Sequence, residues 1–317
     1  MDISVVIVSY NGKDLLSRCL QSLFISTGGL QCEVFVVDNA SDDGTCELVR
    51  SSHSQVILIE NRENVGFARA NNQAITQCRG RYVLLLNPDA QIVAGTLRDL
   101  VAFMDGCPEA GVAGPRLLNR DGSLQWSIRN FPTKANQFFE ALLLHKVIPR
   151  ASRRLGEVVY DPATYSRAHE CDWISGAALI VRREVFDQVG VLDERYFMYS
   201  EEKDFCLRVS RAGWKTYFAP VADVVHLRGD SLKHHQFLTQ LKSRLLYFEK
   251  FHNGMDNVVF RLSLLISFVL RIVLWVVLSA TGRGTGRGRL FNYMRGIPFL
   301  LTIHWKESLD DALTRRQ

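Results

Sequence analysis

Two carboxylates in this sequence have the setting that metal-assisted chemistry on a nucleotide needs. Asp38 and Asp89 each stand at or just beyond a short apolar run, where a side chain can be held rigidly and still face a ligand. One carboxylate can accept hydrogen bonds from a base or ribose, and another beside a diphosphate can hold Mg²⁺ or Mn²⁺ through oxygen. Asp38 suits the first role and Asp89 the second.

A block of acidic residues, Glu201 to Asp204, is a further candidate that also has a simple structural explanation. It follows Ser200, a plausible helix N-cap, and acids in a first helical turn are stabilised by the helix dipole without any function. Asp204 and Arg208 are four residues apart, the spacing of a structural ion pair. The bulky run Tyr196 to Tyr199 would dock this helix start rigidly against a sheet, and that favours a functional block.

The other candidates also have simple alternatives. The run Asp38 to Ser41 is typical of a turn with a helix cap. A single histidine such as His226 is more often structural, although neutral imidazole binds Mn²⁺ and a protonated ring binds phosphate. Because Arg228, Gly229 and Ser231 follow it and could cradle an anion, His226 is a candidate ligand for a metal or a diphosphate.

An α/β scaffold is predicted to position these residues. Short apolar runs predict strands over Ile3 to Val8, Val34 to Val37, Val56 to Ile59 and Tyr82 to Leu86. Helical patterns separate them, over Lys13 to Phe24, about Gly44 to Ser52 and Gly66 to Cys78. Strands that are apolar on both faces belong in a parallel sheet with helices on both sides.

Polar residues follow all of these predicted strands. They are Ser9-Tyr10-Asn11, Asp38-Asn39, Asn61 to Gly66 and Asn87-Pro88-Asp89. Ligands of parallel sheets bind outside the carboxyl ends of the strands, so we expect these residues to converge on one polar rim.

The second half of the chain has a looser pattern. Leu117 to His169 predicts loops and an insertion, a kind of segment that often contacts an acceptor. A structured block then starts at Trp173 to Gly176 and continues through predicted strands over Ala177 to Val181 and near Thr216 to Ala219.

The composition is that of a globular cytosolic protein. At 317 residues, 47% hydrophobic and 22% charged, the chain can bury a full-sized core. The seven cysteines are scattered without a C-x-x-C pair, which argues against a disulfide framework or zinc site and favours a reducing compartment. Met1-Asp2 lead into a strand-like segment without the features of a signal peptide, so we expect no secretion of residues 1–250.

The C-terminal region is the part that resembles a membrane-associated segment. Leu262 to Ala280 is a predominantly apolar run whose only charged residue is Arg271, and it is about long enough to span a bilayer. A single span would send the arginine-rich tail to the far side, so we expect a helix that lies in the cytoplasmic interface or re-enters it. A buried core helix is the alternative. The arginines near the C-terminal end suit binding to an anionic membrane surface better than binding to nucleic acid. We exclude nucleic acid as a partner because the sequence lacks the alternation of aromatic and basic residues that stacks bases.

Taken in order, these residues resemble the inverting glycosyltransferases of family 2. The resemblance covers roughly Ile3 to Ser231 and rests on the blocks VVIVSYNG (5–12), VVDNASDDGT (36–45), ENRENVGFARANNQAI (60–75), LLLNPDA (84–90), SGA (175–177), FMYSEEKDFCLR (197–208) and HLRGDS (226–231). It implies the GT-A fold, with a Rossmann-like, mostly parallel central sheet flanked by helices. It divides the chain into a catalytic domain over 1–255, with a nucleotide-sugar half at about 1–116 and an acceptor half at about 117–255, and a helical membrane-associating region over 256–317.

The resemblance also implies a role for each matched residue. Donor contacts fall to Ser9, Tyr10, Asn11, Asp38, Asn39, Asp42, Asn64, Gly66, Arg69, Asn72, Asn87, Asp89 and His226. Acceptor contacts fall to Trp173, Ser175 and Gly176. Asp89 and His226 would hold Mg²⁺ or Mn²⁺, although Asn87 stands where other members carry an aspartate. The usual Glu-Asp pair reads Glu201-Glu202 here, so Glu202 is the expected base, with Glu201 and Asp204 as alternatives.

The implied reaction is the transfer of a single sugar with inversion. The motifs Val-Ser-Tyr-Asn-Gly, Asp-Asn-Ala-Ser and Asn-Pro-Asp-Ala are similar to a rhamnosyltransferase-like branch, which implies dTDP-L-rhamnose as donor or otherwise a UDP-sugar. The Gln-x-x-Arg-Trp motif and multiple spans of processive synthases are absent from the sequence. We therefore expect a lipid-linked or polysaccharide acceptor at the cytoplasmic membrane face.

Three other classes of protein share part of this pattern. A sugar-phosphate nucleotidyltransferase should carry a glycine-rich basic loop after the first strand, and an NAD-dependent oxidoreductase should carry G-x-G-x-x-G there. The sequence has Ser9 to Gly12 in that place. A non-catalytic membrane-associated nucleotide-binding module remains the third alternative, and sugar-nucleotide hydrolysis would separate it from an enzyme.

Overall fold

The computed structural model of the chain describes residues 1–142, 144, 148–227, 233–280 and 287–301. Its internal contacts group the chain into two compact units. The N-terminal unit comprises Met1–Pro132 and His145–Ser231, and the helical unit comprises Thr133–Leu144 and Leu232–Gln317. The predicted boundary between folding domains at residue 255 stays a prediction.

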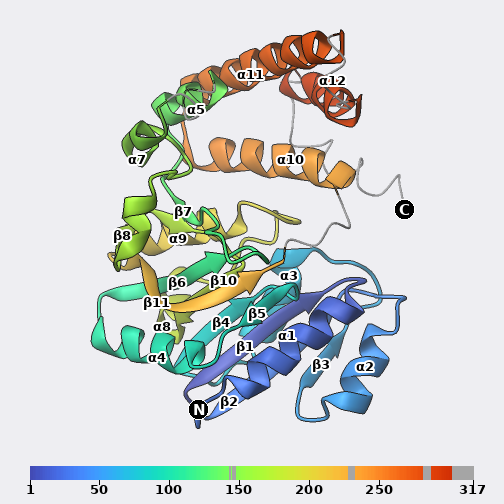
Figure 1. Cartoon of the computed structure of the whole chain (residues 1–317), viewed down its shortest axis with the longest axis vertical. Helices are drawn as coiled ribbons and strands as arrows, with labels where there is room; N and C mark the ends of the chain where they lie inside the picture. The colour runs from blue at the N-terminus through green and yellow to red at the C-terminus, as the bar shows by residue number, and fades with distance from the viewer. Residues whose placement is uncertain (143, 145–147, 228–232, 281–286, 302–317) are drawn as a thin grey trace. The chain divides into compact units, whose positions relative to one another are not determined.

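The N-terminal unit contains the predicted parallel strands, in the sheet order β3-β2-β1-β4 (Figure 1). They are β1 (Ile3–Ser9), β2 (Cys32–Asp38), β3 (Ile57–Glu60) and β4 (Tyr82–Leu86). All of their pairings are parallel, which confirms the α/β fold class expected from the apolar runs. The register pairs Ser9 with Asp38, so β1 and β2 end together at one edge.

Beyond β4 the same sheet becomes mixed. It continues with β10 (Ala178–Arg182), β6 (Ala110–Leu118), β11 (Lys215–His226) and β5 (Ala90–Ile92), and β8 (His169–Cys171) pairs with β11. β10 is antiparallel to β4, and β5 is antiparallel to β11. A separate two-stranded ladder joins β7 (Ile128–Arg129) to β9 (Trp173–Ile174). The segment predicted as loops also contains η1 (Pro149–Ala151), α7 (Ser152–Leu155) and η2 (Pro162–Ser166).

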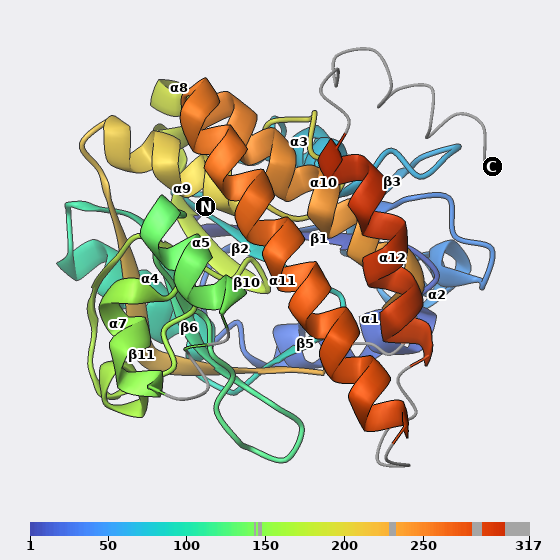
Figure 2. The same cartoon turned by 90° about the horizontal axis from the view of Figure 1, so that it is seen from above.

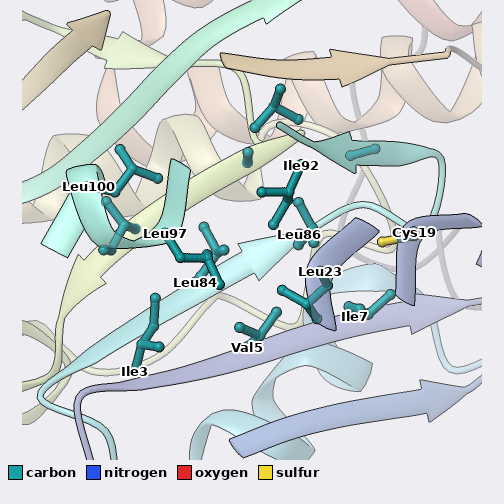
Figure 3. Packing of buried hydrophobic residues seen from close by; sticks show 14 of the residues in the cluster. Ile3, Val5, Ile7, Cys19, Leu23, Leu84, Leu86, Ile92, Leu97 and Leu100 are labelled. Atoms are coloured by element: carbon teal, nitrogen blue, oxygen red, sulfur yellow. The ribbon is translucent and has the colours of Figure 1, made fainter. Parts of the chain in front are cut away.

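Helices cover both faces of this sheet because its strands are apolar on both sides. On β1, Ile3, Val5 and Ile7 join a core with α1 (Lys13–Ile25), α2 (Thr45–Ser52) and α4 (Thr96–Gly106). Figure 3 shows this core, with Cys19 and Leu23 of α1 beside Leu84 and Leu86 of β4. On the other face, Val6 and Val8 join a core with α3 (Phe67–Ile75), α8 (Arg183–Val189) and α9 (Glu201–Arg211). Alternation along a strand thus builds two cores.

The helical unit consists of α5 (Lys134–Ala141), α10 (Lys233–Phe251), α11 (Gly254–Ala280) and α12 (Arg287–Leu301). In Figure 2, α11 and α12 run side by side and α5 lies against α11. The rings of Phe248 and Phe260 stack with centroids 3.6 Å apart, and Arg244 donates to Gln137 Oε1 at 2.6 Å. A helix from the middle of the chain therefore packs with the C-terminal helices.

Candidate active site

The carboxyl ends of β1 and β2 place a buried carboxylate at the polar rim. Asp38 is 2% exposed, and its Oδ2 accepts the backbone N–H of Ser41 at 2.9 Å, while its Oδ1 has no hydrogen-bond partner among the described residues. Burial first, and then a hydrogen bond to Asp38 and the Asp38 charge, followed by the same two effects of Glu60, raise the pKa of the neighbouring Cys46 thiol to about 12. Both the capping alternative and a ligand-binding role are consistent with this geometry, because one oxygen caps the turn and the other is available.

The residues that follow β1 interlock with the turn after β2. Asn11 donates its N–H to Ser41 Oγ at 2.9 Å, and its Oδ1 accepts the N–H of Asp42 at 2.9 Å. Asn11 has a left-handed φ of 49°, a conformation that asparagine tolerates better than most residues. Ser9 is fully buried, and Tyr10 is 44% exposed at the rim. The turn is thus rigid, with one aromatic ring exposed to a ligand.

Asn39 links this turn to the loop after β3. Its Nδ2 donates to the carbonyl of Gly66 at 3.2 Å, and its Oδ1 accepts from Asn61 Nδ2 at 2.9 Å. Asn64 Oδ1 accepts the N–H of Gly66 at 3.0 Å. The amides of Asn39 and Asn64 therefore shape the loop that was expected to close over the donor.

Gly66 is where this loop touches the aromatic run that precedes α9. Its φ is 86°, and a Cβ there would lie 2.6 Å from the Phe197 carbonyl oxygen, which itself accepts the N–H of Phe67 at 2.6 Å. Only glycine fits so close to another backbone. The aromatic run before α9 is therefore docked on the donor loop.

Asn72 and Arg69 of α3 face the loop before α9. Asn72 is 4% exposed, accepts the N–H of Leu192 at 3.1 Å and donates to the Leu192 carbonyl at 2.9 Å. Arg69 approaches Glu194 at 3.9 Å, and both side chains are largely exposed. The Asn72 side chain thus stabilises the loop before α9 through its hydrogen bonds to Leu192 and does not face solvent.

Asp89 and His226 come together because β5 and β11 are antiparallel. His226 pairs in register with Ala90, so its ring lies beside Asp89, with Nε2 3.3 Å from Oδ1. Asn87 Nδ2 is 3.5 Å from the same nitrogen. Arg228, Gly229 and Ser231, the predicted anion cradle, lie outside the described residues.

Gln125, which the sequence patterns did not single out, holds the His226 ring. Its Nε2 donates to the backbone carbonyls of His226 at 2.6 Å and Leu118 at 3.3 Å, so its Oε1 faces His226 Nδ1 at 3.0 Å. Because an amide oxygen can only accept, Nδ1 is the donor in this contact, so a neutral ring would present the lone pair of Nε2 beside Asp89, whereas a protonated ring would donate from Nε2 to Asp89. No local motif marks such a contact between residues 101 apart in sequence.

Gln125→Leu is expected to weaken Mn²⁺ binding by about 10- to 100-fold, the usual effect of removing a partner that orients a metal-ligating histidine. Electron paramagnetic resonance of free Mn²⁺, titrated with protein and nucleotide, measures the affinity, and ¹⁵N spectra report the His226 tautomer. Gln77→Leu, an exposed glutamine that donates to the Gln73 carbonyl, serves as control. Unchanged Mn²⁺ affinity in Gln125→Leu would contradict this role.

The antiparallel β10 brings the predicted acceptor residues to the same edge as Asp89. Its first residue, Ala178, pairs with Leu86 at the end of β4, and Asn87 donates its N–H to the Ala177 carbonyl at 2.9 Å. Gly176, which precedes Ala177, lies beside Glu202. A Cβ added to Gly176 would be 3.5 Å from the Glu202 Cβ. Trp173 of β9 and Ser175 precede Gly176 in the chain, and Ser175 donates its N–H to the Ser127 carbonyl at 3.0 Å.

Glu201 and Glu202 begin α9 after a strained turn. Tyr199 and Ser200 have left-handed φ values of 71° and 69°, and Ser200 makes no side-chain capping bond, unlike the N-cap expected from sequence. Each glutamate has a buried Oε2 without a hydrogen-bond partner among the described residues. Burial raises the pKa of both, and the Glu202 charge adds to the rise at Glu201. Raised carboxyl pKa values suit proton transfer.

Asp204 is the one acid of the block with strong partners. It is fully buried, with Oδ1 accepting from Arg208 Nε at 2.7 Å and Oδ2 accepting from Tyr196 OH at 3.2 Å. Arg208 in turn donates to the carbonyls of Val189 and Val191 at 2.5 and 2.8 Å. The ion pair predicted from the spacing of four is present and ties α9 to the preceding loop.

The fold that holds this site is the GT-A fold. The mannosyltransferase PcManGT from Pyrobaculum calidifontis, solved in complex with GDP-Man and Mn²⁺, aligns with a TM-score of 0.58 and 17% identity over 94% of this chain and 85% of that chain. Residues 1–349 of S. aureus TarS align with a TM-score of 0.51 and 15% identity over 84% of this chain and 80% of that chain. These likenesses concern the fold alone.

The chain belongs to glycosyltransferase family 2, because the family profile "Glycosyl transferase family 2" matches residues 4–189. It is similar to an N-acetylglucosaminyl-diphospho-decaprenol L-rhamnosyltransferase of Mycobacterium tuberculosis, with 30% identity over 282 residues, 84% of this chain and 90% of that protein. It is also similar to the rhamnosyltransferase WbbL of Escherichia coli K12, with 25% identity over 70% of this chain and 82% of WbbL. It is therefore a rhamnosyltransferase-like member of the family.

Proposed function

We propose that this protein transfers a single sugar, L-rhamnose from dTDP-L-rhamnose, with inversion, to a hydroxyl of a lipid-linked acceptor in cell-surface glycan synthesis. The observation that carries the proposal is the position of Glu202. A Cβ at Gly176 would meet the Glu202 side chain at 3.5 Å, and Gly176 is next to the residue whose carbonyl accepts from Asn87, so we assign base and donor edge to one site. The names of the rhamnosyltransferase relatives support the donor and the acceptor class.

In the proposed reaction each rim element has a separate task. Asp38, with one unpartnered oxygen, binds the nucleoside, and the exposed Tyr10 directly follows Ser9, the residue paired with Asp38. Glu202 removes the proton from the acceptor hydroxyl, whose oxygen then attacks the anomeric carbon as the bond to the diphosphate breaks. Trp173 to Gly176 form the acceptor side, and Asn39 fixes the donor loop through its hydrogen bond to the Gly66 carbonyl.

A divalent cation fits the Asp89–His226 pair chemically. Carboxylate oxygen and imidazole nitrogen are both ligands of Mn²⁺, and Gln125 directs the Nε2 lone pair toward Asp89. Among the described residues no cluster of three or more His, Cys, Asp and Glu side chains occurs, so we expect the donor diphosphate and water to complete the coordination. Such a cation would neutralise charge on the departing diphosphate.

A thermal-shift panel tests this function. We expect dTDP-L-rhamnose with Mn²⁺ to raise the melting temperature, because a ligand that binds only the folded state stabilises it by mass action. UDP-sugars and GDP-sugars, with and without Mn²⁺, are the comparison ligands. If none of these shifts the melting temperature, the transferase proposal is wrong, and metal-dependent release of free rhamnose would by itself eliminate a non-catalytic binding module.

We further propose that α11 lies in the cytoplasmic membrane interface. Within its described part Gly254–Val276, an 18-residue stretch has a mean hydropathy of 2.2, and 28% of that stretch is buried. Its exposed side chains are apolar: Met255, Val258, Leu262, Ile266, Val269, Leu270, Val273, Leu274 and Val276. Its polar Ser263 and Ser267 are instead buried, and Arg271 donates to Ser267. An outward apolar stripe with polar residues turned inward is what a lipid-contacting helix requires.

The triple variant Leu262→Ser, Ile266→Ser, Val273→Ser should lose vesicle binding, since each exposed side chain that enters lipid contributes about 1.5–3 kcal/mol. Flotation with vesicles of anionic phospholipid measures the bound fraction. Ile25→Ser with Ile57→Ser, two exposed isoleucines of the N-terminal unit, is the matched control. Wild-type flotation of the triple variant would refute the membrane proposal, provided circular dichroism shows intact helices.

A further inference from the structure

Arg129 is held beside the acceptor side of the site by a fixed aromatic ring. It is the last residue of β7 and pairs in register with Trp173 of β9, and its guanidinium carbon lies 5.8 Å from the centre of the Trp173 ring. The indole is 7% exposed and donates to the carbonyl of Asn130 at 3.0 Å. The indole is thus locked, and the guanidinium lies close to it.

Arg129 forms no ion pair with a carboxylate among the described residues, although its charge reaches Glu202. Its Nη1 is buried without a hydrogen bond, and no carboxylate of the described chain pairs with it. Lys203, 5.0 Å from the same Trp173 ring, differs because it pairs with Glu157 at 2.8 Å. An arginine cannot shed its proton, and a buried guanidinium N–H without an acceptor is costly unless a ligand supplies one.

The same guanidinium acts on the candidate base. Burial raises the pKa of Glu202, and the charge of Arg129 opposes that rise, so the two groups are within electrostatic reach. The backbone reinforces this placement, because Ser175 donates its N–H to the Ser127 carbonyl at 3.0 Å and Gly176 lies on Glu202. An anion bound to Arg129 would therefore lie near the hydroxyl that Glu202 deprotonates.

We propose that Arg129 binds a phosphate group of the acceptor, so that the acceptor is a sugar carried on a phosphate or diphosphate. This inference rests on the proposed function and deepens it. A guanidinium binds phosphate through parallel charge-assisted hydrogen bonds, which its planar fork favours. The donor diphosphate is the other possible source of phosphate, but Asp89 and His226 already provide a place for it, on β5 and β11.

Two acceptor probes with the same sugar test the inference. They are N-acetylglucosaminyl diphosphate on farnesol and octyl N-acetylglucosaminide, which lacks phosphate. For Arg129→Gln we expect kcat/KM with the diphosphate probe to fall by about 10- to 100-fold, the effect of a lost charge-assisted hydrogen bond. The octyl glycoside rate and the Kd for dTDP-L-rhamnose should not change, and Arg129→Lys should recover part of the loss. Each variant is assayed at its own optimal pH.

The control variant is Arg183→Gln. Arg183 is exposed and follows Arg182, and Arg182 pairs with Tyr82 at the end of β4 that lies away from Asp89. Equal losses with both probes would overturn the inference, and so would a weaker Kd for the donor, which would assign Arg129 to the donor phosphates. A wild-type enzyme that uses both probes equally well overturns only the role of Arg129. A wild-type enzyme that uses neither probe, even with bound donor, overturns the proposed acceptor and this inference together.

Discussion

Glu202→Gln is expected to lower kcat by about 10²- to 10⁴-fold, the usual contribution of a general base. The amide has nearly the same size and fits the same space beside Gly176, but it cannot take the proton of the acceptor hydroxyl. Donor binding should persist, because the proposed nucleotide contacts are at Asp38 and not at Glu202. Initial rates of rhamnose transfer, with the Kd for dTDP-L-rhamnose measured separately, check both parts.

Glu201→Gln is the matched control for this variant. Glu201 is also buried, with a raised pKa and an unpartnered Oε2 among the described residues, but Glu202 is the residue in contact with Gly176. We expect Glu201→Gln to keep most of the turnover. Near-normal turnover in Glu202→Gln, with a large loss in Glu201→Gln, would transfer the role of base to Glu201.

The pH dependence of wild-type turnover should also reflect the role of Glu202 as the base. A base works only when ionised, so kcat should fall as the pH is lowered through the pKa of Glu202. Burial raises that pKa above the ordinary glutamate value, which places the acid limb at a higher pH than for an exposed carboxyl group. An acid limb at or below the ordinary range would contradict the assignment.

Asp204→Ala is expected to lower the free energy of unfolding by about 3–5 kcal/mol, the effect of breaking a buried ion pair from one side. The substitution leaves the Arg208 guanidinium without its carboxylate and the Tyr196 hydroxyl without an acceptor. Equilibrium urea unfolding measures this loss. For the protein that remains folded at low temperature, kcat should stay close to the wild-type value.

Asp187→Ala, at an exposed aspartate on α8, should leave stability unchanged and controls for the loss of a carboxylate. A different outcome would change the interpretation of the acidic block. If Asp204→Ala abolished turnover with little change in stability, Asp204 would be a catalytic group and its pairing with Arg208 would be secondary.

Local sequence patterns determined the scaffold and the part of the site at strand ends. Continuous apolar runs of β-branched residues can only be covered from both faces, so β1, β2 and β4 were predictable as buried parallel strands. Residues directly after such strands must meet at one edge, which places Asp38 and Asp89 on the same rim. The spacing of Asp204 and Arg208 likewise predicted their ion pair.

Only the tertiary structure decided which distant residues complete the site. The antiparallel pairings of β10 with β4 and of β11 with β5 bring Gly176 and His226 to the rim, although neither pairing has a local sequence signal. Gln125 reaches His226 through a contact between residues 101 apart in sequence, and Arg129 reaches Trp173 across a strand pair of only two residues. Apolar spacing reports which face of an element is buried, but long-range strand pairing depends on the whole fold. The scaffold of the donor side could therefore be read from the sequence, whereas the surroundings of His226 and Glu202 could not.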